Sequence, residues 1–507
     1  MNKRLITLFF PFLIFPRLWS QILPVEGSNL NYRIIGFTFP PEQQVSRYSI
    51  EIALGNYNTE DSFKKNIILS PFSTTNKIIA EVPSFGCMYT WHMIYKTAGK
   101  VIKKSGFYHF STGMVPEVDR NLNRFRILKK AEKYKDAFVF TDPDRALYDM
   151  NGNPVWYLPG IEDINFDRVA VRDLKITPFG TITFVIDDLA GYEINYNGAV
   201  LWKTPKNGIV SGDSAEHYHH EFTRLNNGHY MILGQETVFW KLPAEQDTSL
   251  IIVPKDNINP ADADFNSKYR QGAMSTIIEY DTQGHALWSW KCSNTLNGSG
   301  ILYQKTERGG QQINPHENSF FFNEETSCIY LSCKNISSII KIKYPDGYLM
   351  NIYNGAIANT NTNINSLFCG QHSCRCSKDG YLYLYSNNSC IKGTTPTILM
   401  MKEPSAKNDS LEKIWEYKCV IDSNIASTFP SGGNVLELPD KSFFVSMAFP
   451  SNNVFIVNPA KKILWSAVAE KWDQDNKKWG SVNLYRASII TNRKQLEQLI
   501  WNAESKR

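Results

Sequence analysis

Short apolar strands alternate with polar turns along most of this chain, and the alternation repeats. In each repeat a strand ends at a turn rich in Asn, Asp or Gly, and an apolar strand that usually carries Trp follows. Asn-Gly and Asp-Gly turns join antiparallel strands well, because both turn residues tolerate a positive φ angle. Six copies are recognisable, at Ala146–Trp156, Tyr192–Trp202, Ile278–Trp288, Ile342–Ile352, Leu411–Trp415 and Val454–Trp465.

A second hairpin accompanies the first, as at Ile176–Phe184, Leu225–Leu233, Cys376–Leu384 and Leu436–Val445. Two hairpins supply four strands, so six such units predict an all-β, six-bladed β-propeller. An insertion in the third unit, Pro243–Gly272, predicts a lid or an edge loop. The helical pattern at Lys494–Glu504 predicts a solvated terminal helix. Blade 4 is the best defined, with strands predicted over Asn318–Asn323, Cys328–Ser332, Ser338–Tyr344 and Tyr348–Tyr353.

Two further segments precede the propeller, which we expect over residues 119–507. Residues 21–118 alternate in short runs such as Ser49–Leu54, which predicts a small antiparallel β-sandwich. At the N-terminus, Lys3 and Arg4 precede the apolar run Leu5–Phe15, which is too short to span a bilayer of ~30 Å. Residues 1–20 therefore predict a signal peptide, with a buried N-terminal strand as the alternative. The mature protein is expected to be exported, periplasmic or extracellular.

Composition narrows the class of protein. The 507 residues carry 54 Lys+Arg against 49 Asp+Glu, a net charge of +5, and no dense basic run, which disfavours a nucleic-acid partner. The mean hydropathy of -0.32 and the lack of a later run of ~18 apolar residues disfavour a membrane span. Aromatic residues at 13% and charged residues at 20% indicate a folded chain rather than a disordered one. The sequence leaves homodimerisation open.

The cysteines fit an oxidising compartment. Cys369, Cys374 and Cys376 cluster, but no second C-x-x-C pair supports a zinc ribbon, so a short disulfide within the cluster is expected. Because nine is an odd number, at least one thiol stays free or pairs elsewhere. The nine are Cys87, Cys292, Cys328, Cys333, Cys369, Cys374, Cys376, Cys390 and Cys419.

Candidate active-site side chains recur at one position of the first, innermost strand in several blades. Arg172, His220 and His372 each lie eight residues before the glycine of the following turn, and His316 opens the first strand of blade 4. The innermost strands of a propeller meet around its axis, so these side chains are expected to share one site. The alternative is that each histidine caps a local turn or fills a polar slot of the core.

Other chemistries find weaker support. His217 and His219 share one strand face and could bind zinc, but no H-E-x-x-H segment occurs. No G-x-S-x-G segment marks a serine nucleophile, and no G-x-x-x-x-G-K-[ST] or G-x-G-x-x-G segment marks a nucleotide site. We therefore expect no metal and no cofactor. Histidines with Lys and Arg suit an anionic sulfate or phosphate ester, whose transferring group carries charge.

Three segments resemble motifs of the bacterial arylsulfate sulfotransferases. They are HHEFTRLNNG at His219–Gly228, PHENS at Pro315–Ser319 with YLSCK after it, and GQHS at Gly370–Ser373. The order of these motifs and the blade count resemble the family over about Asp136–Val482, and the small N-terminal β domain and the export signal that precede this span also match the family plan.

The resemblance implies a nucleotide-independent, metal-independent enzyme that moves a sulfuryl group from an aryl sulfate to a phenol. His372 matches the family's nucleophile, whose neutral imidazole would form a sulfohistidine. His220 and His316 match the other two active-site histidines, which would bind sulfuryl oxygens or protonate the departing phenolate. The family's short-loop disulfide near the nucleophile implies a bond from Cys369 to Cys374 or Cys376.

Substrate binding is assigned to His219, Asn318 and Lys334. Asn318 follows His316 by two residues and is expected to share its strand face as a second donor. The family carries Arg where this chain has Lys334, which keeps the charge but loses the bidentate fork. Lys334 as a solvated blade residue is the alternative, and Arg172 or Arg486 is then a candidate for the guanidinium.

Two functions of other classes remain open beside the sulfotransferase. One is a non-catalytic propeller that binds a ligand or a protein, which the Lys334 departure favours. The other is a hydrolase of sulfate or phosphate esters, in which water replaces the phenol. Three axial histidines count against the binding module, because binding alone does not need them.

Overall fold

A computed structural model describes residues 21–241, 251–259, 261–262, 264–297, 304–305, 311–312, 315–354, 367–390, 395–405, 410–419 and 431–505. The expected signal peptide, residues 1–20, lies outside the described residues. The chain divides into two compact units, Met1–Gly113 and Met114–Arg507. Within the described ranges, no helix has the length and apolar character needed to cross a membrane.

The first unit contains two β-sheets. The larger has the strand order β1–β9–β7–β3–β4, with β5 on β3 and β8 on β7, and the smaller pairs β2 with β6. Its pairings are antiparallel except that of β1 with β9, which is parallel. The rings of Phe37 and Trp91 meet edge to face with centroids 4.9 Å apart, so β2 and β7 share an aromatic core. Its elements are β1 (Ser28–Leu30), β2 (Ile34–Thr38), β3 (Arg47–Leu54), α1 (Glu60–Lys64), β4 (Ile67–Leu69), β5 (Phe72–Ser73), β6 (Lys77–Glu81), β7 (Met88–Thr97), β8 (Lys100–Lys104) and β9 (Tyr108–Thr112).

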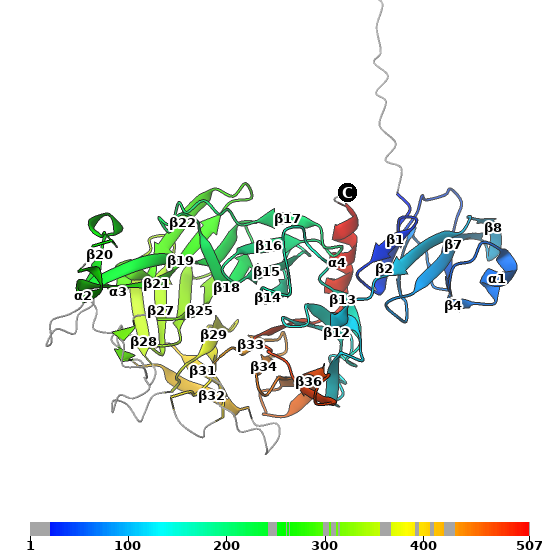
Figure 1. The fold of residues 1–507 in the computed structure, drawn as a ribbon. Helices are drawn as coiled ribbons and strands as arrows, with labels where there is room; N and C mark the ends of the chain where they lie inside the picture. Colours follow the sequence, from blue (N-terminus) through cyan, green and yellow to red (C-terminus); the bar gives the residue numbers. More distant parts are fainter. Residues whose placement is uncertain are drawn as a thin grey trace, which may run out of the picture. The chain divides into compact units, whose positions relative to one another are not determined.

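The second unit confirms the predicted six-bladed propeller. Among its described residues, six antiparallel sheets of four or more strands stand around a ring, with strands such as β14, β18, β29 and β33 toward the middle (Figure 1). From the inside outward, blade 1 contains β38 (Ala487–Ile490), β11 (Phe138–Thr141), β12 (Ala146–Asp149) and β13 (Pro154–Tyr157). Blade 2 contains β14 (Val171–Ile176), β15 (Ile182–Ile186), β16 (Ala190–Ile194) and β17 (Val200–Lys203). Blade 3 contains β18 (His217–Arg224), β19 (Tyr230–Lys241), β21 (Tyr269–Tyr280) and β22 (Ala286–Lys291). Blade 4 contains β25 (Glu317–Asn323), β26 (Cys328–Cys333), β27 (Ser338–Lys343) and β28 (Leu349–Asn354). Blade 5 contains β29 (His372–Cys376), β30 (Leu382–Ser386), β31 (Thr397–Lys402) and β32 (Glu412–Lys418). Blade 6 contains β33 (Asn434–Glu437), β34 (Phe443–Ser446), β35 (Asn453–Val457) and β36 (Ile463–Asp473).

Both predicted hairpin families are present. The Trp-bearing hairpins form the outer strand pairs, such as β12–β13 and β16–β17, and the second family forms the inner pairs, such as β14–β15 and β29–β30. Gly180, Gly228 and Gly380 take φ angles of 67°, 90° and 82° in the inner turns, a conformation that glycine adopts at little cost. The blade 4 strands agree with the predicted ranges to within one residue at each end.

Strands from opposite ends of the second unit close the ring. β38, near the C-terminus, pairs with β11 and so becomes the innermost strand of blade 1. β10 (Asn123–Lys129) pairs with β36 and adds an outer strand to blade 6, which also carries β37 (Lys478–Ser481). The C-terminal strand thus belongs to the first blade and an N-terminal strand belongs to the last, which closes the ring.

Two peripheral segments refine the predictions. The terminal helix α4 (Arg493–Ser505) is present, but it is not simply solvated. Leu496, Leu499, Ile500 and Ala503 are buried, and their i, i+3, i+4, i+7 spacing makes one packed face. In the insertion of blade 3, β20 (Ile251–Val253) pairs with β19 as an edge strand. The remaining short elements are η1 (Pro116–Val118), η2 (Lys255–Asn257), α2 (Phe265–Lys268), α3 (Cys292–Leu296), β23 (Gln304–Lys305) and β24 (Gln311–Gln312).

Candidate active site

The innermost strands of blades 2 to 5 are interrupted by bulges. The pairing register shifts in β14, β18, β25 and β29. A non-glycine residue with positive φ lies in or beside each bulge: Asp173, His220, His316 and Ser373. A bulge breaks the alternation of a strand and redirects side chains, and such left-handed residues cost ~1–3 kcal/mol and gather at functional sites. This part of the propeller is therefore the candidate site.

The eight-residue spacing seen in the sequence conceals a difference in register. Arg172 and His372 occupy equivalent positions, paired with Val185 and Tyr385. β18 pairs at Tyr218 with Gly234 and at Phe222 with Ile232, so it holds two extra residues where β14 and β29 each hold one. His220 therefore lies inside a wider bulge, which lets the neighbouring His219 and His220 both face the site.

The structure brings the predicted histidines together. His219, His220 and His316 line a cavity of about 230 Å³, and the ring centroids of His220 and His316 are 5.4 Å apart. The Nδ1 atoms of His219 and His220 lie 2.8 Å apart, so one ring donates a hydrogen bond to the other. Nε2 of His219 lies 3.1 Å from Oγ of Ser275. The ring of Tyr485 lies between two members of the group, with centroids 5.7 Å from His220 and 6.1 Å from His372.

His372 is enclosed by the surrounding protein. Its side chain is fully buried, and it is not among the residues that line the cavity. Its Nδ1 lies 2.7 Å from Oδ1 of Asn387, and the backbone N–H of Gly432 donates to its Nε2 over 3.1 Å. The imidazole is thus held at both nitrogens.

Burial keeps these imidazoles in the neutral form. Burial lowers the pKa of His219, and burial together with the neighbouring His219 holds the pKa of His220 well below its usual value. Burial and the charge of Lys334 lower the pKa of His316 to about 3, and the same two causes hold the pKa of His372 well below its ordinary range. A neutral imidazole offers one donor and one acceptor, as a nucleophile or a hydrogen-bonding group requires.

The two polar residues expected beside the histidines are placed differently. Lys334 is close to His316, whose backbone oxygen accepts the Lys334 N–H over 3.0 Å, and burial lowers the pKa of its ammonium. Asn318 is fully buried and donates from Nδ2 to the backbone oxygen of Gln371 over 2.8 Å. The register shift between Glu317 and Ser319 breaks the alternation that would have put Asn318 on the face of His316. The sequence-based reason for making Asn318 a second donor therefore does not hold.

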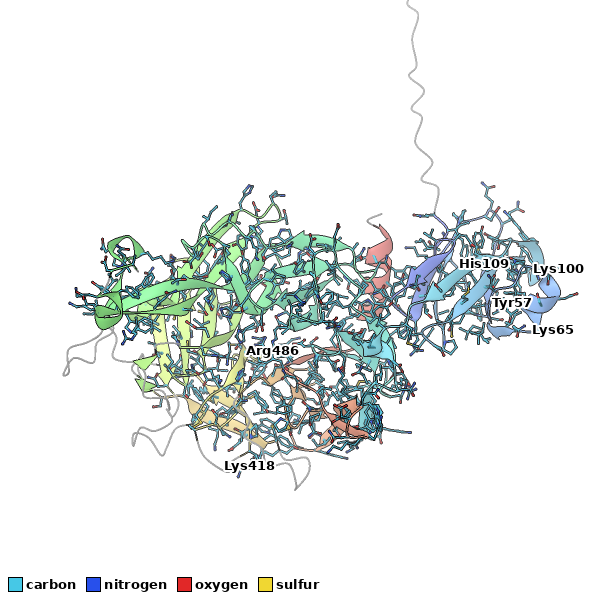
Figure 2. The ribbon with its side chains drawn as sticks, viewed as in Figure 1. Tyr57, Lys65, Lys100, His109, Lys418 and Arg486 are labelled. Atoms are coloured by element: carbon cyan, nitrogen blue, oxygen red, sulfur yellow. A yellow bond between two sulfur atoms is a disulfide. The ribbon has the colours of Figure 1, made fainter. Side chains whose placement is uncertain are left out.

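Both arginines that could supply a guanidinium group to the substrate are paired with carboxylates of the protein. Arg172 pairs through Nε with Oδ2 of Asp187 over 3.0 Å, and its guanidinium carbon lies 4.2 Å above the ring of Tyr485. Arg486 is almost fully buried among the inner strands (Figure 2), where it pairs with Asp173 and Glu221. The charge of Lys334 lowers the pKa of both His316 and His372. Unlike Arg172 and Arg486, Lys334 has no carboxylate partner among the described residues.

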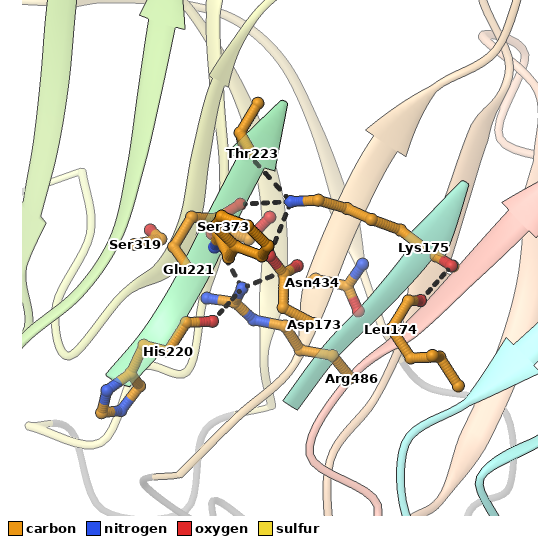
Figure 3. Close-up of polar contacts among 12 residues, drawn as sticks. Asp173, Leu174, Lys175, His220, Glu221, Thr223, Ser319, Ser373, Asn434 and Arg486 are labelled. Atoms are coloured by element: carbon orange, nitrogen blue, oxygen red, sulfur yellow. Dashed lines mark hydrogen bonds and ion pairs between the residues drawn. The ribbon is translucent and has the colours of Figure 1, made fainter. Parts of the chain in front are cut away.

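Five charged residues, Asp173, Lys175, Glu221, Arg375 and Arg486, form a buried to half-buried group that we call the ionic layer. Figure 3 labels all of them except Arg375. Glu221 is its centre, with carboxylate oxygens 3.1 Å from Lys175 Nζ, 2.7 Å from Arg375 and 2.8 Å from Arg486. Burial alone would raise the pKa of Glu221, but these three cations hold it well below the usual value.

The ionic layer satisfies backbone groups that the bulges release. Arg486 donates to the backbone oxygens of His220 and Asn318 over 3.1 and 2.6 Å, and Asp173 accepts the N–H of Phe222 over 3.0 Å. In Figure 3 the His220 carbonyl faces the guanidinium while its imidazole points away. Buried backbone groups need such partners, so these charges stabilise the bulges that present the histidines.

The expected disulfide partner was wrong. Cys369 is bonded to Cys390, 21 residues later, and both Cys374 and Cys376 are free. The physical reason is that Cys374 and Cys376 belong to β29 and pack in the apolar core with residues of blade 4, whereas Cys369 and Cys390 lie just outside the two ends of the inner hairpin. The disulfide therefore ties the ends of the hairpin that carries His372.

The described residues offer no set of ligands for the alternative of a zinc site. Within the part of the chain that the structure describes, no three His, Cys, Asp or Glu side chains gather in a way that could hold a metal ion. His217 is exposed and His219 is buried, because the bulge of β18 begins after Tyr218.

Comparison with known proteins decides the family. The family model "Arylsulfotransferase (ASST)" matches residues 126–419, more than half of the chain. This chain belongs to the arylsulfotransferase family. Membership supports an aryl sulfotransferase enzyme with small-molecule substrates, and the match contains His220, His316, Lys334 and His372. No curated protein matches the chain.

Similarity to solved structures is distant. A protein of unknown function from Bacteroides caccae is 11% identical over 70% of this chain and 98% of its own, with a TM-score of 0.40. The Cps50 (Swd1) β-propeller domain of Myceliophteria thermophila is 7% identical over 68% and 89%, with a TM-score of 0.32. Apo AztD from Citrobacter koseri is 7% identical over 88% and 98%, with a TM-score of 0.31.

Sequence reasoning missed three residues at the site: Asn387, Gly432 and Tyr485. Asn387 had a usable signal, because the turn at Gly380 sets a hairpin register in which Tyr385 pairs with His372 and Asn387 follows two residues later. Gly432 and Tyr485 come from the segments that enter β33 and β38, outside the match to the family. Nothing in the repeat marked them.

Proposed function

We propose that this enzyme transfers a sulfuryl group from an aryl sulfate to a phenol through a sulfohistidine at His372. The observation that carries the proposal is a neutral, buried imidazole whose Nδ1 faces an amide oxygen and whose Nε2 lone pair faces a single N–H donor. Such a ring is a nucleophile that needs no base to remove a proton before it attacks.

The neighbouring groups suit the charge that moves during transfer. Lys334 is a partly desolvated ammonium near His316 and His372, and a cation in such surroundings stabilises sulfuryl oxygens more than it would in water. His220 and His316 are neutral and can donate a hydrogen bond to a sulfuryl oxygen or to the departing aryl oxygen. His219 would keep His220 oriented through the Nδ1–Nδ1 hydrogen bond.

The chain is also proposed to act outside the cytoplasm. The charged start and short apolar run of residues 1–20 support export. The Cys369–Cys390 disulfide supports an oxidising compartment, because disulfides persist there and not in the cytosol.

The test is a transfer assay with 4-nitrophenyl sulfate as donor, with and without a phenol, and without any nucleotide. Release of nitrophenolate that depends on the phenol is expected. His372→Gln should lower that rate by about 10³-fold or more, as loss of a nucleophile does. The matched control is His92→Gln, which replaces another buried histidine, in the first unit, hydrogen-bonded to Glu51, and should keep the wild-type rate.

Release without phenol would assign an ester hydrolase instead. No release from folded wild-type protein would favour a binding propeller and make Lys334 the first residue to replace. A His372→Gln variant as active as wild type would overturn the nucleophile assignment alone.

A further inference from the structure

His372, Asn387 and Gly432 form a closed ring of hydrogen bonds. Nδ1 of His372 lies 2.7 Å from Oδ1 of Asn387, and Nδ2 of Asn387 donates to the backbone oxygen of Gly432 over 3.0 Å. The N–H of the same Gly432 donates to Nε2 of His372 over 3.1 Å. His372 and Asn387 are 0% and 1% exposed, so these bonds are shielded from bulk solvent.

The ring fixes the tautomer of His372 from two independent directions. A backbone oxygen only accepts, so Asn387 must turn its NH₂ group to Gly432 and its oxygen to the imidazole. A backbone N–H only donates, so Nε2 must be an acceptor. Both constraints put the proton on Nδ1 and the lone pair on Nε2.

Glycine is required at position 432 for this geometry. Its φ angle is +75°, and a Cβ atom there would approach the backbone oxygen of Tyr485 to 2.8 Å. A larger residue would displace the peptide group that orients Asn387, so the backbone of blade 6 helps to set the chemistry of a blade 5 side chain.

We propose that Asn387 is the positioning residue of the nucleophile: it holds the proton of His372 on Nδ1 and stabilises the ring when Nε2 accepts the sulfuryl group. The inference rests on the proposed function. The Nε2 lone pair forms the N–S bond and displaces the Gly432 N–H, while the S–O bond breaks and its electron pair leaves with the aryl oxygen. The ring becomes cationic and keeps its Nδ1 proton, which the Asn387 oxygen accepts as a stronger, charge-assisted hydrogen bond.

The second half of the reaction reverses the charge. The acceptor oxygen attacks sulfur as the phenol gives up its proton, the N–S bond breaks, and its electron pair returns to Nε2. The proton lost by the acceptor balances the proton that the first phenolate takes up. Asn387 therefore acts twice in each cycle without being protonated itself, as an orienting acceptor does in other histidine-dependent sites.

Asn388 provides a matched control beside Asn387. Its Nδ2 donates to the backbone oxygen of Thr395 over 2.7 Å, and its Oδ1 accepts from Ser386 over 2.6 Å. Replacing either asparagine by aspartate sets an oxygen against a backbone oxygen, so the two variants should lose similar stability. Only Asn387→Asp puts a carboxylate on the imidazole of His372.

The experiment compares the pH dependence of kcat/KM for wild type, Asn387→Asp and Asn388→Asp. The groups that act on His372 are Lys334, His316, Arg486 and Tyr485, and the first three favour the neutral ring. An aspartate at 387 opposes them and favours the imidazolium, so the acidic limb should move to higher pH by about one unit or more. Asn388→Asp should keep the wild-type limb. Asn387→Leu, which removes the acceptor, should lower kcat by about 10- to 100-fold with the donor KM within about 3-fold.

A second readout does not depend on turnover. In protein labelled with ¹⁵N-histidine, the His372 signal, assigned by its loss in His372→Gln, should show a proton on Nδ1 in wild type and in Asn388→Asp. In Asn387→Leu the Nδ1 proton loses its acceptor while the Gly432 N–H still donates to Nε2, so the Nδ1–H resonance should shift to lower frequency. An unshifted Nδ1–H resonance and unchanged kcat in folded Asn387→Leu, or identical acidic limbs in both aspartate variants, would overturn the role of Asn387. Full transfer activity in His372→Gln would instead overturn the proposed nucleophile, and the two failures are thereby distinguished.

Discussion

The innermost strands of the propeller contribute to the site in two different ways. In blades 2 to 5 the strands β14, β18, β25 and β29 are bulged, and the bulges present side chains. In blades 6 and 1 the strands β33 and β38 pair without a register shift. The segments that enter these two regular strands bring Gly432, Tyr485 and Arg486 to the site.

The difference shows how one ring of similar blades can build an asymmetric site. The bulged strands place strained histidines on the axis, and each bulge releases backbone groups that need partners. The regular strands contribute Arg486 and the Gly432 peptide, whereas the other four members of the ionic layer lie on the bulged strands β14, β18 and β29. The bulges are thus supported partly by their own charges and partly by groups from blades 6 and 1, so a change in the ionic layer should affect stability and activity together.

The largest effect is expected from breaking the support. Glu221→Gln would leave the buried Arg486 and the half-buried Lys175 and Arg375 with one carboxylate fewer, and loss of one partner from a buried ionic group costs about 3–5 kcal/mol. Because the bulge of β18 depends on the same layer, transfer activity should fall with it. The measurement is the free energy of unfolding of the propeller in urea, alongside kcat.

Glu470 is the matched control for Glu221. It also pairs with two arginines, Arg124 and Arg126, but at 13% exposure on blade 6. Pairs of this more exposed kind contribute about 1 kcal/mol or less, so Glu470→Gln should change stability little and leave kcat unaltered. Equal losses in the two variants would show that the ionic layer has no special role.

A smaller effect is expected from removing the cation on the bulged side. Lys334→Met should lower kcat/KM for the aryl sulfate by about 100-fold, because a desolvated donor to a developing charge is worth roughly that much. Lys343→Met, on the neighbouring strand β27 with its ammonium on the Thr326 carbonyl, should stay within about 2-fold. Lys334→Arg should hold or raise activity, and a large loss there would show that the site has adapted to an ammonium.

The repeat itself was predictable from the sequence because it is local. Hairpins are set by residues a few positions apart, so the Asp346-Gly347 turn and the short apolar runs of this region placed blade 4 to within a residue. His220, His316 and His372 were expected to lie near one another because the innermost strands of a propeller meet around its axis, although His220 lies in a wider bulge and is not in register with His372.

What the sequence did not reveal depends on contacts between distant segments. The partner of Cys369 was misplaced because proximity in the chain favoured Cys374, whereas the ends of the inner hairpin bring Cys390 close instead. The extra residue of the β18 bulge left no trace in the spacing to Gly228. The pairing of β38 with β11 and the reach of Gly432 to His372 cross blades, so periodicity within one blade could not indicate them.

The smallest effect tests the strained side through its histidines. Burial and Lys334 lower the pKa of His316 to about 3, whereas an unfolded chain titrates at about 6.5. Between these values the unfolded state binds a proton that the folded state excludes, so stability is greatest above pH about 6.5 and falls as the pH drops toward 3. The slope from this one group is up to about 1.4 kcal/mol per pH unit, and His316→Asn should remove it from the urea-unfolding profile. His285→Asn, at a side chain that is 75% exposed, should leave the profile unchanged; equal slopes in wild type and His316→Asn would mean that the imidazole is not held neutral by its surroundings.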